Sequence, residues 1–305
     1  MSDRADSSRP TDPNGLVLEA WGQGLMVGSL VVMAAVTVAN MKKNVLLHKL
    51  IFVELLLAMP HGTFIFAHSP VYEWYLSFTV IGLIVSWSLH NVIAWMKNKP
   101  FLSRRVSLFY ISTVILVQPY WVVEIYANFA YFQNGNPIYQ TTRPMEPLFR
   151  DPWWIFTTIS FVWTIKYVYS FGIVELVIVA PRFGILLVSM CLSIIFMIVE
   201  TCSVLHAFNT ADLPTGIQPF WKLSFIFKCL CDTVILDDFK TALDQIRSHR
   251  FHRSIPTDED SLCRHRSPRQ VGVEAGFELG PRPNVPTKQE EPLPSVVLRE
   301  DAGTR

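Results

Sequence analysis

Long apolar blocks separated by short polar segments dominate the chain up to about residue 236. A helix needs about 20 apolar residues to cross the hydrocarbon part of a bilayer, and the blocks have this length. The apolar runs are continuous rather than alternating, which excludes a transmembrane β-barrel. The pattern predicts an all-α, polytopic membrane bundle of about seven transmembrane helices, at 16–39, 45–66, 74–96, 106–131, 153–180, 184–207 and 218–236.

Polar segments flank this region on both sides. Residues 1–15 form a polar N-terminal segment, 16–238 the transmembrane domain, and 239–250 a short helix on the cytosolic side. From residue 251 to 305 the chain holds seven of its twenty prolines among mixed charges. Such a composition buries too little apolar surface to fold, so a disordered tail is expected.

Composition agrees with a membrane protein and excludes several other classes. Half of the residues are hydrophobic and 17% are charged, against roughly 25% charged in soluble domains. The net charge is +1 and no basic patch is present, so no nucleic-acid partner is expected. The five cysteines show no CxxC spacing, and most lie in apolar blocks. We therefore expect them to pack as small hydrophobic residues, with no metal site and no cofactor.

The number of lysine and arginine residues alternates between high and low from one predicted loop to the next. Cytosolic loops carry an excess of these residues, and here the first and third loops are the rich ones, whereas 132–152 has only Arg143 and Arg150. The bias predicts that the C-terminus lies in the cytosol. We expect an integral, multi-pass protein of the endoplasmic reticulum or another endomembrane. The residues that set this orientation are Lys42, Lys43, Lys97, Lys99, Arg104 and Arg105.

Ionisable residues inside the spans are candidate site residues, because charge in a membrane interior is costly. Glu124 and Glu200 each lie seven residues from the lumenal end of a predicted span, hence roughly 10 Å below the same surface. His61 lies at a similar depth. Glu54, seven residues before His61, shares its helical face but lies deeper. A structural alternative for Glu54 is an ion pair with Lys166 or Lys228.

Two stripes of polar and aromatic residues accompany the carboxyl groups. Trp121, Glu124 and Asn128 recur at i, i+3 and i+7, which places them on one helical face. A second face combines Glu200 with Ser189, Ser193 and Ser203. If both faces point inward, they form an aromatic, water-poor chamber open to the lumen. Burial favours the protonated form of a carboxyl group, which an acid catalyst requires.

Four stretches carry a resemblance to a known family: QPYWVVEIYANFAYF (118–132), RDPWWIF (150–156), PRFGILL (181–187) and PFWKLSFIFKCLCDTVILDDFKTALDQI (219–246). Over about 16–250 the chain resembles fungal integral membrane proteins of meroterpenoid biosynthetic clusters, most of all the epoxide-closing membrane terpene cyclases of the ascofuranone type. The resemblance implies an isomerase-type terpene cyclase of fungal secondary metabolism. Its substrate would be a lipophilic, prenylated aromatic compound, and the reaction would use neither a metal nor a cofactor.

Site roles follow as expectations from the polar stripes and this resemblance. Glu124 or Glu200 would protonate the epoxide, and the other carboxylate or His61 would take the proton of the attacking hydroxyl. The remaining expected contacts with the substrate come from Trp121, Tyr120, Tyr126, Asn128 and Glu54. The three aromatic rings among them would shield developing positive charge.

Other classes of membrane protein are alternatives. A seven-helix receptor or sensor shares the predicted orientation, and a small-molecule transporter is a further alternative, although no inverted repeat is visible. A retinal protein would use Lys228 but lacks a carboxylate in 75–96. A haem protein would use His48 and His61 but lacks a second such pair.

The predicted orientation has a direct test. A glycosylation acceptor inserted in 132–152 should be modified, because this segment is expected in the lumen, and one placed after residue 250 should stay unmodified. A shift in gel mobility that is reversed by deglycosylation reports the result. The opposite pattern would reverse the orientation and with it the depth assigned to Glu124 and Glu200.

Overall fold

The predicted all-α fold is confirmed in the computed structural model, which describes residues 13–67, 73–170, 172–205, 219–236 and 239–254. Within these ranges every regular element is helical and no strand occurs. The expected tail at 251–305, most of the polar segment 1–15 and the connections around 68–72 and 206–218 lie largely or wholly outside the described residues.

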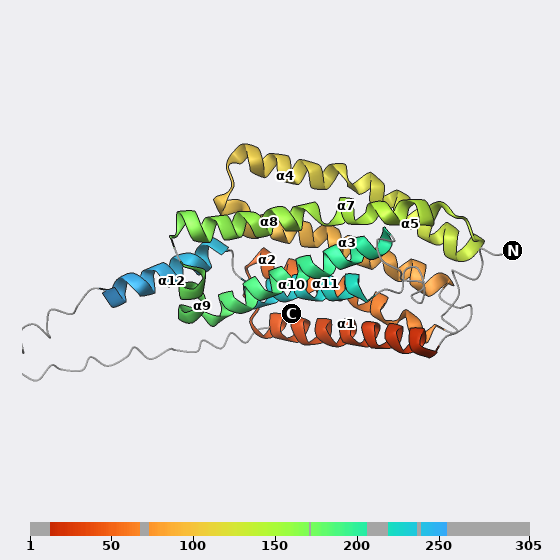
Figure 1. The fold of residues 1–305 in the computed structure, drawn as a ribbon, viewed down its shortest axis with the longest axis horizontal. Helices are drawn as coiled ribbons and strands as arrows, with labels where there is room; N and C mark the ends of the chain where they lie inside the picture. Colours follow the sequence, from red (N-terminus) through yellow and green to blue (C-terminus); the bar gives the residue numbers. More distant parts are fainter. Residues whose placement is uncertain (1–12, 68–72, 171, 206–218, 237–238, 255–305) are drawn as a thin grey trace, which may run out of the picture. The chain divides into compact units, whose positions relative to one another are not determined.

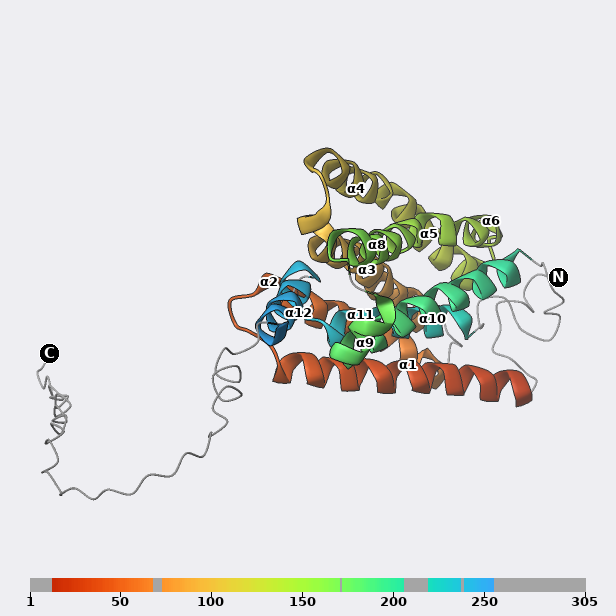
Figure 2. The same ribbon diagram turned by 60° about the vertical axis from the view of Figure 1, so that its left-hand side comes forward.

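Most of the long helices run along one common direction (Figure 1). Short helices α6, η3 and α7 connect α5 to α8, and α12 follows α11 (Figure 2). The elements are α1 (Pro13–Ala39), α2 (Leu46–Ala58), η1 (Met59–Phe66), α3 (Glu73–Asn98), η2 (Lys99–Phe101), α4 (Arg104–Leu116), α5 (Gln118–Asn134), α6 (Ile138–Thr142), η3 (Arg143–Met145), α7 (Glu146–Arg150), α8 (Pro152–Trp163), η4 (Thr164–Val168), α9 (Ile173–Val179), α10 (Pro181–Val204), α11 (Phe220–Val234) and α12 (Phe239–Ser254).

The expected count of seven spans is not confirmed. Among the described residues five helices are long and apolar enough to cross a membrane, and a sixth is gained if the bent pair Ile138–Val168 and Ile173–Val179 forms one span. The predicted span 218–236 is the short helix α11, which has 15 residues and is therefore about 22 Å long. Its Lys222, Lys228 and Asp232 are buried inside the bundle.

The predicted span 153–180 is interrupted. The α-helix α8 ends at Trp163 and continues as a π-helical turn, η4. Ser170 then adopts a positive φ of 52°, a left-handed conformation that ends a helix. The bent pair that includes α9 meets at 91°. Apolar composition alone did not reveal this break.

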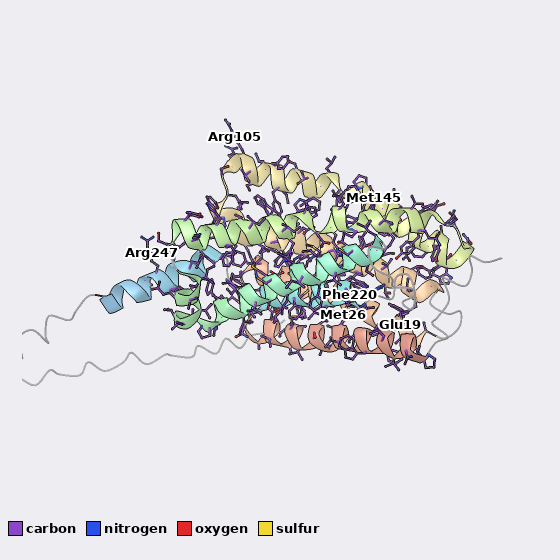
Figure 3. All side chains as sticks on the ribbon, in the orientation of Figure 1. Glu19, Met26, Arg105, Met145, Phe220 and Arg247 are labelled. Atoms are coloured by element: carbon purple, nitrogen blue, oxygen red, sulfur yellow. The ribbon has the colours of Figure 1, made fainter. Side chains whose placement is uncertain are left out.

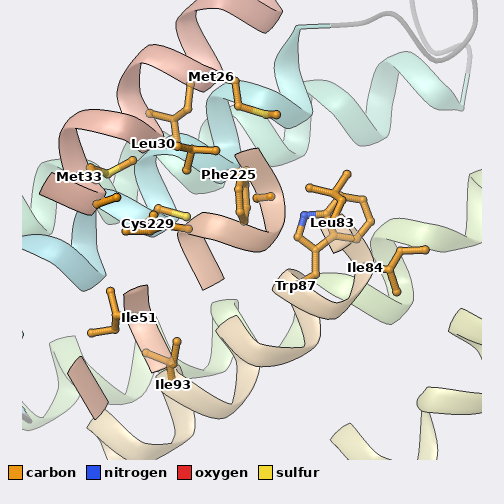
Figure 4. Packing of buried hydrophobic residues seen from close by; sticks show 14 of the residues in the cluster. Met26, Leu30, Met33, Ile51, Leu83, Ile84, Trp87, Ile93, Phe225 and Cys229 are labelled. Atoms are coloured by element: carbon orange, nitrogen blue, oxygen red, sulfur yellow. The ribbon is translucent and has the colours of Figure 1, made fainter. Parts of the chain in front are cut away.

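The main hydrophobic core joins α1, α2, α3 and α11. Met26, Leu30 and Met33 of α1 lie near Phe225 and Cys229 of α11, and Leu83 and Trp87 of α3 belong to the same cluster (Figure 4). On the outside, large apolar side chains are exposed, such as Leu116 at 78% and Val122 at 67%. Such a surface suits lipid rather than water, so the chain is a membrane protein. Charged side chains project outward, such as Arg105 near the start of α4 and Arg247 in the middle of α12 (Figure 3).

Gly82 marks the closest approach of α2 and α3. A Cβ atom at this position would lie 2.6 Å from the backbone oxygen of Leu57, which is too close for any side chain. Gly24 on α1 offers a contrast, because a Cβ there would meet no atom within 4 Å.

We expect Gly82→Ala to destabilise the bundle by about 1–3 kcal/mol, because the helices must separate to admit the methyl group. Gly24→Ala should be neutral or stabilising by up to about 1 kcal/mol, since alanine favours a helix. Thermal unfolding in detergent measures both variants. Equal melting temperatures for the two would contradict the close contact.

Candidate functional site: a buried ionic and aromatic cluster

The predicted stripe on α5 is its buried face. Trp121, Glu124 and Asn128 are each 3% exposed, and Glu124 Oε2 and Asn128 Oδ1 have no hydrogen-bond partner. Tyr126, in contrast, is 63% exposed on another side of the helix. The structure therefore brings Trp121, Glu124 and Asn128 into the bundle and leaves Tyr126 outside it.

The stripe on α10 is buried as well, and Glu200 on it is an ion-paired carboxylate. Arg150 Nη2 lies 2.6 Å from Glu200 Oε2, and Arg143 Nη2 lies 3.3 Å from Glu200 Oε1. A buried carboxylate held by two guanidinium groups is stabilised as an anion. Both oxygens of Glu200 are thus engaged by arginines, which leaves this carboxylate less free than Glu124 to meet a substrate.

The arginines come from the segment between α5 and α8. Arg143, Glu146, Arg150 and Asp151 are each at most 7% exposed. Arg143 pairs with Glu146, Arg150 Nη1 lies 2.7 Å from Glu146 Oε1, and Arg150 Nη2 lies 3.0 Å from Asp151 Oδ2. The short helices α6, η3 and α7 thus fold a charged stripe into the bundle.

Lys228 of α11 completes the ionic cluster. Its Nζ lies 2.5 Å from Asp151 Oδ1. Lys228 and the two arginines thus face the three carboxylates of Glu146, Asp151 and Glu200. The formal charges balance, which a low-dielectric interior requires.

Glu124 lies next to this cluster. Its carboxyl group interacts electrostatically with Glu146 and Arg143, and the hydroxyls of Tyr120 and Thr142 lie close to it. The Tyr120 hydroxyl also donates to the backbone oxygen of Thr142 at 2.9 Å. Glu124 and Glu200 therefore both interact with Arg143 but lie in different environments: Glu200 is paired with two arginines, and Glu124 keeps one unpaired oxygen.

Aromatic rings line the cluster in a continuous series. The guanidinium carbon of Arg150 lies 5.0 Å from the ring centre of Trp87. Trp87 lies 5.8 Å from Trp121 and 6.1 Å from Trp221. Tyr120 extends the series, 5.2 Å from Trp121 and 4.2 Å from Phe149. These rings present polarisable faces to any group that develops positive charge.

His61 closes the series on η1, 5.9 Å from Trp221. Its Nδ1 lies 3.1 Å from the hydroxyl of Thr79, and that hydroxyl lies 2.8 Å from the backbone oxygen of Tyr75. Because a hydroxyl has one hydrogen, Thr79 donates to the backbone and accepts from His61 Nδ1. In the neutral ring, Nε2 is then the unprotonated nitrogen that accepts a proton.

Glu54 lies in a different group. Its Oε1 is 3.0 Å from His90 Nδ1, and it pairs with neither Lys166 nor Lys228, which corrects both structural alternatives. Lys228 bonds Asp151, and Lys166 lies over the ring of Tyr167. The expected contact of Glu54 with a substrate in the chamber finds no support in this placement.

Sequence reasoning missed the ionic cluster of residues 143–151. It treated the segment as a lumenal loop because the segment carries few lysine and arginine residues. The signal was the spacing of Arg143, Glu146 and Arg150 at i, i+3 and i+7, which aligns charged side chains on one face.

Comparisons of the chain with protein-family models, with curated proteins and with solved structures find no match. The resemblance to membrane terpene cyclases therefore stays an expectation, and function is argued from the geometry.

Arg150 contacts Glu146, Asp151, Glu200 and Trp87, so its removal should leave the buried cluster one positive charge short and take one partner from each of three carboxylates. We expect Arg150→Leu to destabilise the protein by about 3–5 kcal/mol, the usual cost of breaking a buried ion pair. Arg105→Leu is the control, because Arg105 is exposed at the start of α4. Folded yield and thermal unfolding in detergent measure the effect. An Arg150→Leu protein as stable as the control would show that the ionic cluster does not hold the bundle together.

Proposed function

We propose that this protein is a membrane-bound cyclase that closes a ring on an epoxidised prenyl chain by acid-catalysed epoxide opening. The observation that carries the proposal is the contrast between two neighbouring buried carboxyl groups. Glu124 has an unpaired oxygen beside aromatic rings, whereas Glu200 is fixed between two guanidinium groups. Pairs of carboxyl groups in unlike environments divide acid and electrostatic roles in enzymes.

Glu124 is the proposed acid. In its neutral form it donates a proton to the epoxide oxygen as the carbon–oxygen bond breaks, and the electron pair of that bond becomes a lone pair of the new hydroxyl. The hydroxyl of Tyr120 lies close enough to orient the carboxyl group. Trp121 and Tyr120 border the position where positive charge develops on carbon.

A hydroxyl of the substrate then attacks this carbon and loses its proton. His61 Nε2 is the proposed acceptor, because the hydrogen bond of Nδ1 to Thr79 fixes the tautomer. One proton enters and one leaves, so the reaction is an isomerisation. Exchange of a proton with solvent then returns the acid and the base to their starting forms.

An apolar groove supports a lipophilic substrate. It lies between α1 and η1, the element that carries His61, and has a volume of about 710 Å³, within the range of about 300–1,000 Å³ typical of ligand sites. Its lining is mostly apolar and includes Ala20, Gly24, Gly28 and Gly62, with Gln23 and Thr63 as its polar residues. Such a groove suits the apolar prenyl tail of a substrate.

The test is conversion of an epoxyfarnesyl aromatic compound by membranes that contain the protein. Glu124→Gln keeps the volume but removes the transferable proton, so we expect a rate loss of about 10²–10⁴-fold at unchanged protein level. Glu200→Gln should instead lower the amount of folded protein, because it leaves Arg150 and Arg143 short of a partner.

Glu175→Gln on α9 serves as the control and should keep its rate. A Glu124→Gln protein with normal conversion would exclude Glu124 as the acid. Absence of conversion by the unaltered protein, with binding of the same compound retained, would favour a transporter or receptor over a cyclase.

A further inference from the structure

A second polar cluster lies away from the proposed acid. Glu54 from α2, His90 from α3 and Asp232 from α11 are all buried, and one ligand atom of each lies within 4.8 Å of the other two. Cys229 of α11 adds a fourth donor atom, with its Sγ 3.7 Å from Glu54 Oε1. The three residue types and the thiol are the usual ligands of zinc-class ions.

The cluster is not satisfied by its own hydrogen bonds. His90 Nδ1 lies 3.0 Å from Glu54 Oε1 and 2.9 Å from Asp232 Oδ2. A ring nitrogen carries at most one hydrogen, so it cannot serve both carboxylates fully. Glu54 Oε2 and His90 Nε2 have no hydrogen-bond partner although they are buried, and Asp232 Oδ2 has only the ion pair with His90.

We propose that these four residues bind a divalent transition-metal ion of the zinc class. Adjacent ligands about 2.1 Å from a metal are about 3.0–3.4 Å apart, and a thiolate at about 2.3 Å is about 3.6 Å from an oxygen ligand. The separations of 2.9, 3.0 and 3.7 Å match these spacings. A metal ion would replace the shared proton of His90 as the group that holds both carboxylates.

Neighbouring groups hold the ligands in place. Lys97 Nζ lies 2.9 Å from Asp232 Oδ1, which leaves Oδ2 directed at the ion. The ring of His90 lies 5.0 Å from the ring of Trp154, whose Nε1 donates to Ser193 at 2.7 Å. Outer partners of this kind orient metal ligands in proteins. The site joins α2, α3 and α11.

The experiment measures metal content rather than activity, so its result is independent of the proposed cyclase. The full chain is expressed in medium supplemented with Zn²⁺ or Co²⁺, which loads the site during folding, and is purified in detergent without chelator. Elemental analysis gives the ions per chain, and the Co²⁺ protein is examined for the absorption band of a cobalt–thiolate bond.

We expect about one ion per chain in the unaltered protein and an occupancy at least about 10-fold lower in Asp232→Asn. Loss of a metal ligand should lower the metal affinity at least as much as loss of a residue that only hydrogen-bonds a ligand. Cys229→Ser should fold normally and lose the cobalt–thiolate band. Cys231→Ser is the matched control, since its thiol is equally buried on α11 but lies 3.7 Å from the backbone oxygen of Leu186, and the band should persist.

Two results would overturn the site. One is an unaltered protein without bound metal, in which case the cluster is a network of hydrogen bonds and ion pairs alone. The other is an equal cobalt spectrum in Cys229→Ser and Cys231→Ser, which would place the ion elsewhere.

Discussion

Every charge inside this bundle has to find its partner within the protein, because lipid offers none. Arg150 meets this requirement for three buried carboxylates at once. Its guanidinium group reaches Glu146, Asp151 and Glu200 and lies over the ring of Trp87. Through these contacts the side chain of Arg150 joins α7 to α3 and α10. Asp151 adds a contact with α11 through Lys228.

Helix α11 connects the two polar clusters. Lys228 belongs to the ionic cluster, and Asp232, one turn further along, belongs to the group around His90. Residues four apart share one helical face, so α11 presents opposite charges to two sites on the same side. Any shift of α11 along its axis would disturb both clusters together. The proposed acid and the proposed metal site are therefore mechanically linked, although no residue serves both.

The amino-acid sequence predicted the helical fold and the inward faces of α5 and α10 because both follow from periodicity, which is a local property. Trp121, Glu124 and Asn128 could be assigned to one face without knowing their neighbours. The partners of Glu54 and Lys228 could not be assigned, since several charges at similar depth were equivalent until the packing was known. The burial of the segment 143–151 was missed for a related reason: the number of lysine and arginine residues indicates the side of the membrane on which a segment lies, but does not tell whether the segment lies in solvent or in the bundle. The count of seven spans is not confirmed, in part because α11 is buried in the bundle but has only 15 residues.

The short length of α11 has a consequence for how the protein is made. The last carbonyl groups of a helix that ends within a bundle need donors, and Lys97 Nζ supplies them, 3.1 Å from the backbone oxygen of Asp232 and 2.6 Å from that of Ile235. This lysine is synthesised more than a hundred residues before α11. When α11 leaves the ribosome, its donor is already in the membrane at the end of α3. A helix with three buried charges and 15 residues has little tendency to enter lipid alone, so its insertion depends on helices that preceded it. We therefore expect the helices to assemble in chain order, with α11 inserted last among them, after α3 has supplied the donor for its end.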